Sequence, residues 1–250
     1  MSEEVSIQPA AEHVSLVEFN RPPNNFFDAG LIRQIADAYD ELERGSECRA
    51  IVLGSAGKNF CAGANFHGPN PAEDDLYEQA VRLFSGSLPV VAAVQGAAIG
   101  GGLGVALSAD FRVASPDSRF SANFARLGIH HGFGITVTLP LVVGHQRALE
   151  LLYTGVRLRG EEAHQIGLCD RLVASEEVRQ EALALAEEIA TSSPLAVQAI
   201  RRTMRGDLPQ RIREATAHEA AEQAKLFGTQ DFQEGVAAAT ERRPPRFTGS

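Results

Sequence analysis

A glycine-rich junction between an apolar strand and an apolar helix constrains the fold of this chain more than any other feature. Residues 90–107 read VVAAVQGAAIGGGLGVAL. The first five residues follow Pro89 and predict a short strand that is buried on both faces, and the last segment predicts an apolar helix. The first N–H groups of a helix have no partner inside it, and glycine lets a ligand approach them closely. The segment therefore predicts an α/β core. Its turn either binds an oxygen atom that gains negative charge, or allows two helices, or a helix and a strand, to pack closely.

A second segment repeats this arrangement. Residues 51–64 read IVLGSAGKNFCAGA, a buried strand followed by a turn of small residues. Neither segment is a nucleotide-binding motif. GxGxxG fails because Val105 occupies the place of its last glycine, and GxxxxGK[ST] fails at Val52 and Asn59. The absence of a GxSxG elbow argues against a serine hydrolase.

The rest of the chain alternates strands and helices and then becomes helical. Strands are predicted at 14–19, 50–53, 111–114 and 119–121, and Asp28 is the expected N-cap of the first helix. Helical spacing is found at 147–153, 160–166, 175–191, 194–205 and 209–227, and the proline-rich tail after Glu241 is expected to be extended. This order predicts a core over residues 1–195 and a helical C-terminal region over residues 196–250.

Charge and composition exclude several classes of protein. The net charge of −9 argues against a nucleic-acid surface, which would need a basic stripe. The three cysteines, Cys48, Cys61 and Cys169, have no CxxC spacing and fit free thiols in a reducing compartment. No apolar run reaches the roughly 18 residues that span a bilayer, and the N-terminus has no apolar signal core. We expect a cytoplasmic protein without membrane or nucleic-acid partners.

At the two glycine turns the sequence resembles a known family. The segments Asn59–Ala64 and Ala98–Leu103 are similar to the two signature segments of the enoyl-CoA hydratase/isomerase (crotonase) superfamily, and the resemblance covers roughly residues 12–248. It implies an α/β fold with a crotonase-like ββα-spiral core and a helical C-terminal trimerisation region. It also implies an acyl-CoA thioester as ligand, coenzyme A as part of the substrate with no separate cofactor and no metal, and a homo-trimer or dimer of trimers.

The resemblance also implies roles for individual residues. The backbone amides of Ala64 and Gly101 would form an oxyanion hole for the thioester oxygen. Residues that would hold the pantetheine and adenine are Arg21, Asn25, Ala62, Phe227 and Arg242. The last two are the positions at which the C-terminal helix of a neighbouring subunit would close the adenine end. A solvated tail charge is the alternative for Arg242.

The sequence departs from the family where proton transfer is expected. The two glutamates of a hydratase correspond to Gly104 and Phe124, and the carboxylate of the isomerases and dehalogenases falls near Gly132. We expect His131, or less favourably His130, to be the polar group of the acyl pocket, because imidazole exchanges protons near neutral pH. A loop histidine bound to backbone is the alternative.

Other side chains could add polar groups to the pocket. Asn123 could orient a water or a carbonyl, or could simply be a turn residue. His67 and the acidic run from Glu73 to Glu78 lie where relatives often carry a lid, although a solvated helix start is the simpler interpretation. The arginines between 201 and 213 are expected on an exposed or interfacial salt-bridged surface.

Two functional hypotheses follow. In the first, the chain is an enzyme that acts on an acyl-CoA thioester through an enolate stabilised by the oxyanion hole, with doubtful classical hydratase activity. In the second, it is a non-catalytic CoA-ester binding paralogue. A decarboxylase or C–C hydrolase variant using His131 is a further alternative to classical hydration.

Overall fold

The computed structural model describes residues 4–64 and 75–250. Its larger sheet has the strand order β1-β2-β3-β4-β6-β9, in which β1 is antiparallel to β2 and the other neighbours are parallel. The strands are β1 (Val5–Ala11), β2 (Val14–Phe19), β3 (Ala50–Ser55), β4 (Val90–Val94), β6 (Phe111–Ala114) and β9 (Arg171–Leu172). β3 and β4 are fully buried, as their unbroken apolar sequences predict.

A smaller three-stranded sheet lies beside the glycine turns. It consists of β5 (Ala97–Ile99), β7 (Arg119–Ser121) and β8 (Leu158–Arg159), in the order β5-β7-β8. The predicted apolar helix after the glycines is α3 (Gly101–Ser108), all of whose residues are buried. An isolated parallel bridge joins Cys61 to Ala98, so the two glycine turns lie side by side.

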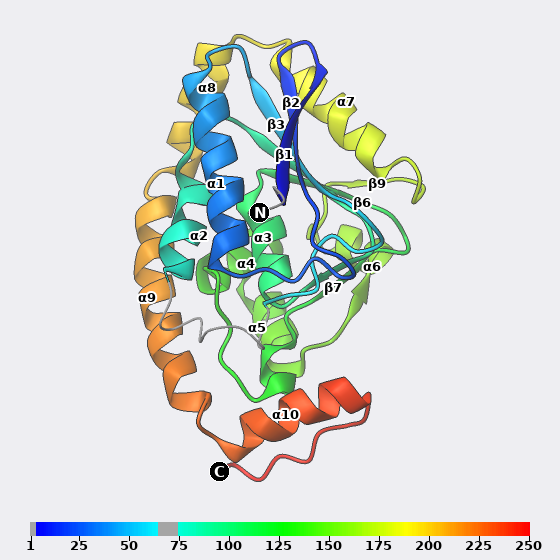
Figure 1. Ribbon diagram of the computed structural model, residues 1–250, viewed down its shortest axis with the longest axis vertical. Helices are drawn as coiled ribbons and strands as arrows, with labels where there is room; N and C mark the ends of the chain where they lie inside the picture. The colour runs from blue at the N-terminus through cyan, green and yellow to red at the C-terminus, as the bar shows by residue number, and fades with distance from the viewer. Residues whose placement is uncertain (1–3, 65–74) are drawn as a thin grey trace.

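Helices cover both faces of the larger sheet. Helix α7 (Val178–Ala190) contacts β2, β3, β4 and β6 and forms a separate apolar cluster with them. The other helices are α1 (Ala29–Arg44), α2 (Leu76–Ser85), α4 (Ile135–Val143), α5 (His145–Thr154), α6 (Gly160–Gln165), α8 (Pro194–Arg205), α9 (Leu208–Leu226) and α10 (Gln230–Glu241), with a short 3₁₀ helix η1 (Asn123–Leu127). Figure 1 shows α1 and α7 on opposite sides of the sheet.

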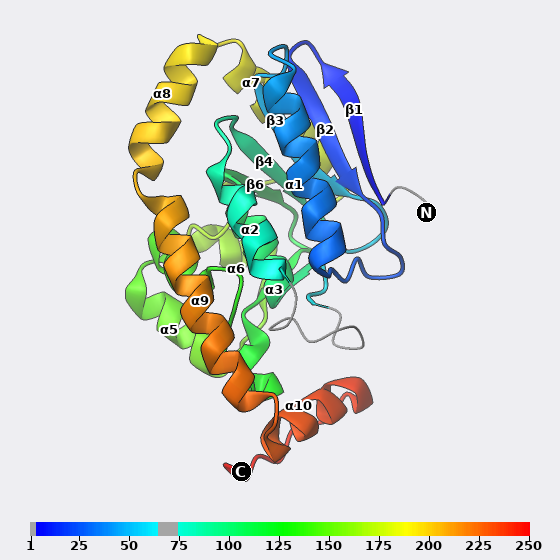
Figure 2. The ribbon, with the colours of Figure 1, turned by 60° about the vertical axis from the view of Figure 1, so that its left-hand side comes forward.

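The C-terminal helices form an arm along one side of the molecule. In Figure 2, α8 and α9 follow one another down this side and α10 lies across the lower end. Helix α9 contacts α2 and α4, and α10 contacts η1. The contact between α10 and η1 is close, because a Cβ at Gly235 would lie 2.4 Å from the carbonyl carbon of Leu127. This arrangement brings α9 and α10 to the same region as α2 and η1.

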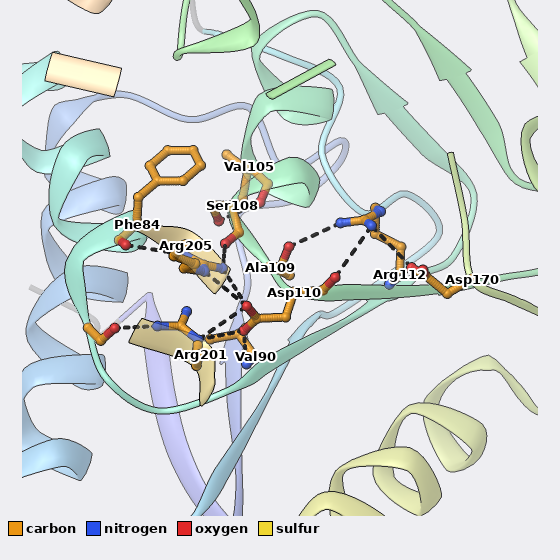
Figure 3. A network of polar contacts seen from close by, with 11 residues as sticks. Phe84, Val90, Val105, Ser108, Ala109, Asp110, Arg112, Asp170, Arg201 and Arg205 are labelled. Atoms are coloured by element: carbon orange, nitrogen blue, oxygen red, sulfur yellow. Dashed lines mark hydrogen bonds and ion pairs between the residues drawn. The ribbon is translucent and has the colours of Figure 1, made fainter. Parts of the chain in front are cut away.

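Helix α8 directs charged side chains toward the core and apolar side chains outward. Its Arg201 and Arg205 reach inward to Asp110, at 2.9 Å and 2.8 Å, and are 8% and 13% exposed (Figure 3). Its Ile200 and Met204 are instead 63% and 80% exposed. The prediction of an exposed or interfacial arginine surface is therefore wrong for these two arginines, which are buried because Asp110 and backbone carbonyls satisfy them.

The expected fold class is confirmed: the chain has an α/β core of the predicted kind, followed by helices. Asp28 caps α1 as expected, since its Oδ1 accepts a 3.0 Å hydrogen bond from the Leu31 amide. The division at residue 195 and the role of the C-terminal helices in trimerisation stay predictions. No helix in the described ranges is both long and apolar enough to cross a membrane.

Candidate functional site

A cavity of about 360 Å³ opens where the glycine turns, α2, η1 and the C-terminal helices meet. This volume is typical of small-molecule sites. Its lining is mainly apolar and includes both glycine turns. The lining residues are Phe26, Phe27, Ala62, Gly63, Ala64, Leu76, Tyr77, Ile99, Gly100, Gly101, Asn123, Phe124, Leu127, Ile129, Gly132, Phe133, Gln223, Phe227, Val236, Ala239 and Thr240.

The two predicted amides both belong to residues that line this cavity. Gly101 is the first residue of α3, where the N–H has no intrahelical acceptor. Ala64 forms a parallel bridge with Phe27 in which the Phe27 amide donates to the Gly63 carbonyl. Within residues 4–64 and 75–250 neither the Ala64 nor the Gly101 amide has a backbone hydrogen-bond acceptor. Two residues at the cavity wall thus have an amide without a backbone acceptor in this part of the chain.

Close packing also explains part of the glycine run. A Cβ at Gly102 would lie 2.2 Å from the Cys61 carbonyl oxygen, and one at Gly101 would lie 2.5 Å from Cζ of Phe27. The backbone of Gly100 has a φ of 56°, in the left-handed region that favours glycine. The packing interpretation is thus supported at Gly101 and Gly102, and the donor interpretation stays a prediction.

Aromatic and amide side chains fill the places where relatives of the predicted family carry carboxylates. A Cβ at Gly104 would lie 2.6 Å from Cβ of Phe133, so no longer side chain fits there without a shift. A Cβ at Gly132 would lie 2.2 Å from the Tyr77 hydroxyl and 2.8 Å from Nε2 of Gln223. Phe124 is 7% exposed and lines the cavity itself. Close packing therefore excludes a side chain at position 104 unless Phe133 moves, while the neighbours of Gly132 are the ends of two side chains.

The polar groups of the cavity are few and neutral. In the described part of the chain they are the side chains of Tyr77, Asn123, Gln223 and Thr240, with no Asp, Glu, Lys, Arg or His. The Tyr77 hydroxyl donates to Oε1 of Gln223 at 2.6 Å, and burial raises the pKa of Tyr77, which keeps it protonated at neutral pH. The Asn123 Oδ1 is buried and has no hydrogen-bond partner among the described residues.

The structure does not support His131 as the polar group of the acyl pocket. His131 is absent from the cavity lining, and its Nε2 lies 2.8 Å from Oγ1 of Thr136. Its ring stacks on His130 at 4.1 Å. Burial, and to a lesser extent the two neighbouring histidines, lowers the pKa of His131 to about 4, so it is neutral at pH 7. The expectation fails because the loop directs this ring toward α4 and α9.

A buried glutamate explains the position of His131. Glu219 on α9 is fully buried and accepts hydrogen bonds from the amides of Gly134 and Thr136, at 2.8 Å and 3.0 Å, and from the Thr136 hydroxyl at 2.6 Å. Since that hydroxyl donates to Glu219, its oxygen accepts from Nε2–H of His131. Burial raises the pKa of Glu219 against these hydrogen bonds. This hydrogen-bond network holds in place the loop at the end of the cavity. The side chains of the network do not themselves line the cavity.

Two of the predicted CoA-binding side chains are occupied within the protein. The Arg21 guanidinium pairs with Glu4 and Asp28, at 2.8 Å to each through separate nitrogens. The Asn25 side chain is 2% exposed; its amide donates to the carbonyls of Ala56 and Asn59, and its oxygen accepts from the Arg21 amide, each at 2.8 Å. Asn25 therefore holds the first glycine turn in place, and neither side chain lines the cavity.

The remaining predicted residues divide between the cavity and the surface. Ala62 and Phe227 line the cavity. Arg242 ends α10 in the left-handed conformation, is exposed and is not part of the lining, and its role at the site of a neighbouring subunit stays a prediction. His67, Glu73 and Asp74 lie outside the described residues. Tyr77 and Gln223 were missed, because they are separated by 146 positions and no motif connects them.

Comparisons with known proteins identify the family of this chain. The sequence profile of the family described as Enoyl-CoA hydratase/isomerase matches residues 10–250. A short-chain-enoyl-CoA hydratase of Clostridium acetobutylicum is 34% identical over 244 residues, which cover 92% of each chain. A mitochondrial Delta(3,5)-Delta(2,4)-dienoyl-CoA isomerase of Pongo abelii is 30% identical over 263 residues, covering 96% of this chain and 80% of that one.

Solved structures give the same result. An enoyl-CoA hydratase/isomerase from Pseudoalteromonas atlantica superposes with a TM-score of 0.89 at 29% identity, covering 98% of this chain and 100% of the other. A carnitinyl-CoA hydratase from Mycobacterium avium superposes with a TM-score of 0.85 at 28% identity, covering 100% of both chains. Because the family profile spans nearly the whole sequence, this chain belongs to the enoyl-CoA hydratase/isomerase family.

Proposed function

We propose that this chain binds an acyl-CoA thioester with its acyl group in the cavity and its thioester oxygen on the amides of Ala64 and Gly101. The observation that carries the proposal is the pair of amides, neither with a backbone acceptor among the described residues, on two residues at the wall of a mainly apolar cavity. Names of similar proteins support the ligand class, since the relatives in Clostridium acetobutylicum and Pongo abelii are named for enoyl-CoA and dienoyl-CoA substrates.

Binding is better supported than classical hydration. Two amides that polarise the thioester carbonyl would also stabilise an enolate, because the negative charge develops on the oxygen that they contact. Enolate chemistry also needs a group that moves the proton, and no described residue of the cavity has a carboxylate or an imidazole. We therefore favour a role in binding CoA esters, in which the two amides polarise the thioester carbonyl.

The variants that depend on His131 are less well supported. A decarboxylase or C–C hydrolase in which His131 contacts the acyl group would need its ring in the cavity. Its Nε2 is instead engaged by Thr136, and its lowered pKa disfavours the cation that would hold a carboxylate.

Calorimetry and a hydration assay test the proposal together. Titration of the purified chain with butyryl-CoA and octanoyl-CoA is expected to give micromolar dissociation constants, with free coenzyme A binding at least about tenfold more weakly. Crotonyl-CoA, followed by absorbance of its enoyl thioester, is expected to bind without hydration above the uncatalysed rate. Hydration at a rate typical of enzymes, on the order of 1 s⁻¹ or faster, contradicts the binding role. Equal affinity for free coenzyme A contradicts acyl recognition.

We further propose that copies of this chain associate through α8, as the expected trimer or dimer of trimers requires. The helix anchors its arginines in the core and exposes Leu195, Ile200 and Met204, the reverse of an ordinary surface helix. Light scattering after size-exclusion chromatography is expected to show a trimer or hexamer for the wild type and smaller species for Met204→Glu. A monomeric wild type contradicts this proposal.

A further inference from the structure

The cavity wall is unusually rich in aromatic rings. Six of the lining side chains in the described part of the chain are aromatic: Phe26, Phe27, Tyr77, Phe124, Phe133 and Phe227. They come from separate parts of the chain, namely the loop before α1, the start of α2, η1, the loop before α4 and the end of α9. Rings from several elements therefore face one space, which a single aromatic stripe on one helix would not achieve.

Two of these rings occupy space in which the resemblance to the family predicts glutamate side chains. Phe124 occupies the position of one hydratase glutamate, and Phe133 fills the space that a side chain at Gly104 would need. Phe133 has a φ of 64°, an uncommon conformation for a bulky residue, and its ring packs edge-on against Phe27 at 5.3 Å. Phe26 keeps 39% of its surface exposed although it is large and apolar. Phe124 keeps 7% of its surface exposed and Phe27 and Phe133 keep 2% each, so Phe26 and Phe124 present more surface to the cavity than those two rings do.

From this wall we infer that the acyl group is aromatic: an arylcarbonyl or arylalkanoyl thioester rather than a straight-chain fatty acyl thioester. The inference rests on the proposed acyl-CoA binding and specifies its ligand. Edge-to-face and offset ring contacts each add about 2- to 10-fold in affinity beyond the apolar area they bury. A flexible alkyl chain buries comparable area but loses more rotational freedom when it is held.

A pair of ligands with the same number of acyl carbons tests the inference by calorimetry. Phenylacetyl-CoA is expected to bind the full chain at least about tenfold more tightly than octanoyl-CoA. In Phe124→Leu the ring contact is lost while the apolar volume is largely kept, so the preference is expected to fall to about threefold or less. Phe111→Leu is the matched control, because Phe111 lies on β6, is 37% exposed and does not line the cavity. That variant is expected to keep the wild-type preference.

Phe26→Leu supplies a second variant if Phe124→Leu does not fold, since Phe26 is partly exposed at the cavity. Equal or tighter binding of octanoyl-CoA by the wild type overturns the inference and leaves the proposed acyl-CoA binding intact. An unchanged preference in both Phe124→Leu and Phe26→Leu also overturns it. If neither ester binds more tightly than free coenzyme A, the proposed function itself fails.

Discussion

Replacing Gly104 by alanine tests whether the position of a hydratase glutamate is sterically closed in this chain. Gly104 lies inside α3, and a Cβ placed there would meet Cβ of Phe133 at 2.6 Å and its Cγ and Cδ1 at 2.9 Å. Real Cβ atoms do not approach other atoms this closely, so something must move. The atom in the way is bonded directly to the backbone of Phe133, so rotating the phenyl ring does not remove the clash.

Two opposing effects set the size of the change. Alanine in a helix interior is more favourable than glycine by about 1 kcal/mol. An extra methyl group in a packed core costs about 1–3 kcal/mol, and more where the neighbour cannot adapt. Because the contact is with a backbone-linked atom, we place the cost at or above the top of that range. Gly104→Ala is then expected to lower the free energy of unfolding by about 2 kcal/mol and the melting temperature by about 4–8 °C.

Thermal and urea unfolding, with Gly45→Ala as the control, measure this change. The nearest atoms to a Cβ at Gly45 are 3.6 Å away, so that variant is expected to stay within about 0.5 kcal/mol of the wild type. A double-mutant cycle adds the cause: Phe133→Gly, which removes the Cβ that clashes, should cost about 2 kcal/mol less in the Gly104→Ala background than alone. A Gly104→Ala variant as stable as the wild type, with no coupling to Phe133, refutes the reasoning.

Three further predictions concern the polar groups around the cavity. Because the pKa of His131 is lowered to about 4 in the folded protein, the unfolded chain takes up a proton at this residue at a higher pH than the folded chain does. Stability is therefore fully present above about pH 6.5 and falls as the pH drops toward 4. The free energy of unfolding, measured with urea, should fall by about 3 kcal/mol over this pH range in the wild type and should not fall in this way in His131→Gln. Equal pH profiles for the two proteins contradict the prediction. Glu219→Gln is expected to lower the free energy of unfolding by about 2 kcal/mol, because an amide NH₂ would face the N–H of Gly134 or Thr136. A glutamine variant as stable as the wild type indicates instead that Glu219 is protonated in the folded protein. Asn123→Leu removes a buried oxygen that has no partner among the described residues and should raise the melting temperature by about 2–4 °C. A lower melting temperature shows that the amide is satisfied in the folded protein.

Much of the fold was predictable because local sequence and tertiary environment agree. The helix over 194–205 is observed with the same bounds, and β4 matches its predicted apolar run. Among the elements that were not predicted are β1, α4 and α10. β1 at the sheet edge is largely polar, α10 lies in the polar C-terminal part, and α4 is apolar all round with Pro140 inside it. None of these has the clean period of an amphipathic element, so periodicity alone could not find them.

The sequence predicted the part of the candidate site that consists of backbone positions better than the part that consists of side chains. Ala64 and Gly101, which were chosen from the glycine turns, both line the cavity, and the role of their amides as donors to a thioester oxygen stays a prediction. Side-chain assignments were weaker. His131 and Asn25 lie near the site in sequence, but their hydrogen bonds direct them to Thr136 and to the first glycine turn. Such partners come from distant parts of the chain, and a single sequence does not show them.

One affinity measurement tests the central claim most directly. Octanoyl-CoA and S-octyl-CoA differ at the carbonyl oxygen and share the chain and the coenzyme, so their calorimetric affinities isolate what that oxygen contributes. If the amides of Ala64 and Gly101 receive it, the thioester should bind about tenfold or more tightly than the thioether, since two hydrogen bonds are each worth about 1 kcal/mol. Equal affinity for the two ligands would mean that no donor in the cavity contacts the oxygen, and would contradict the account.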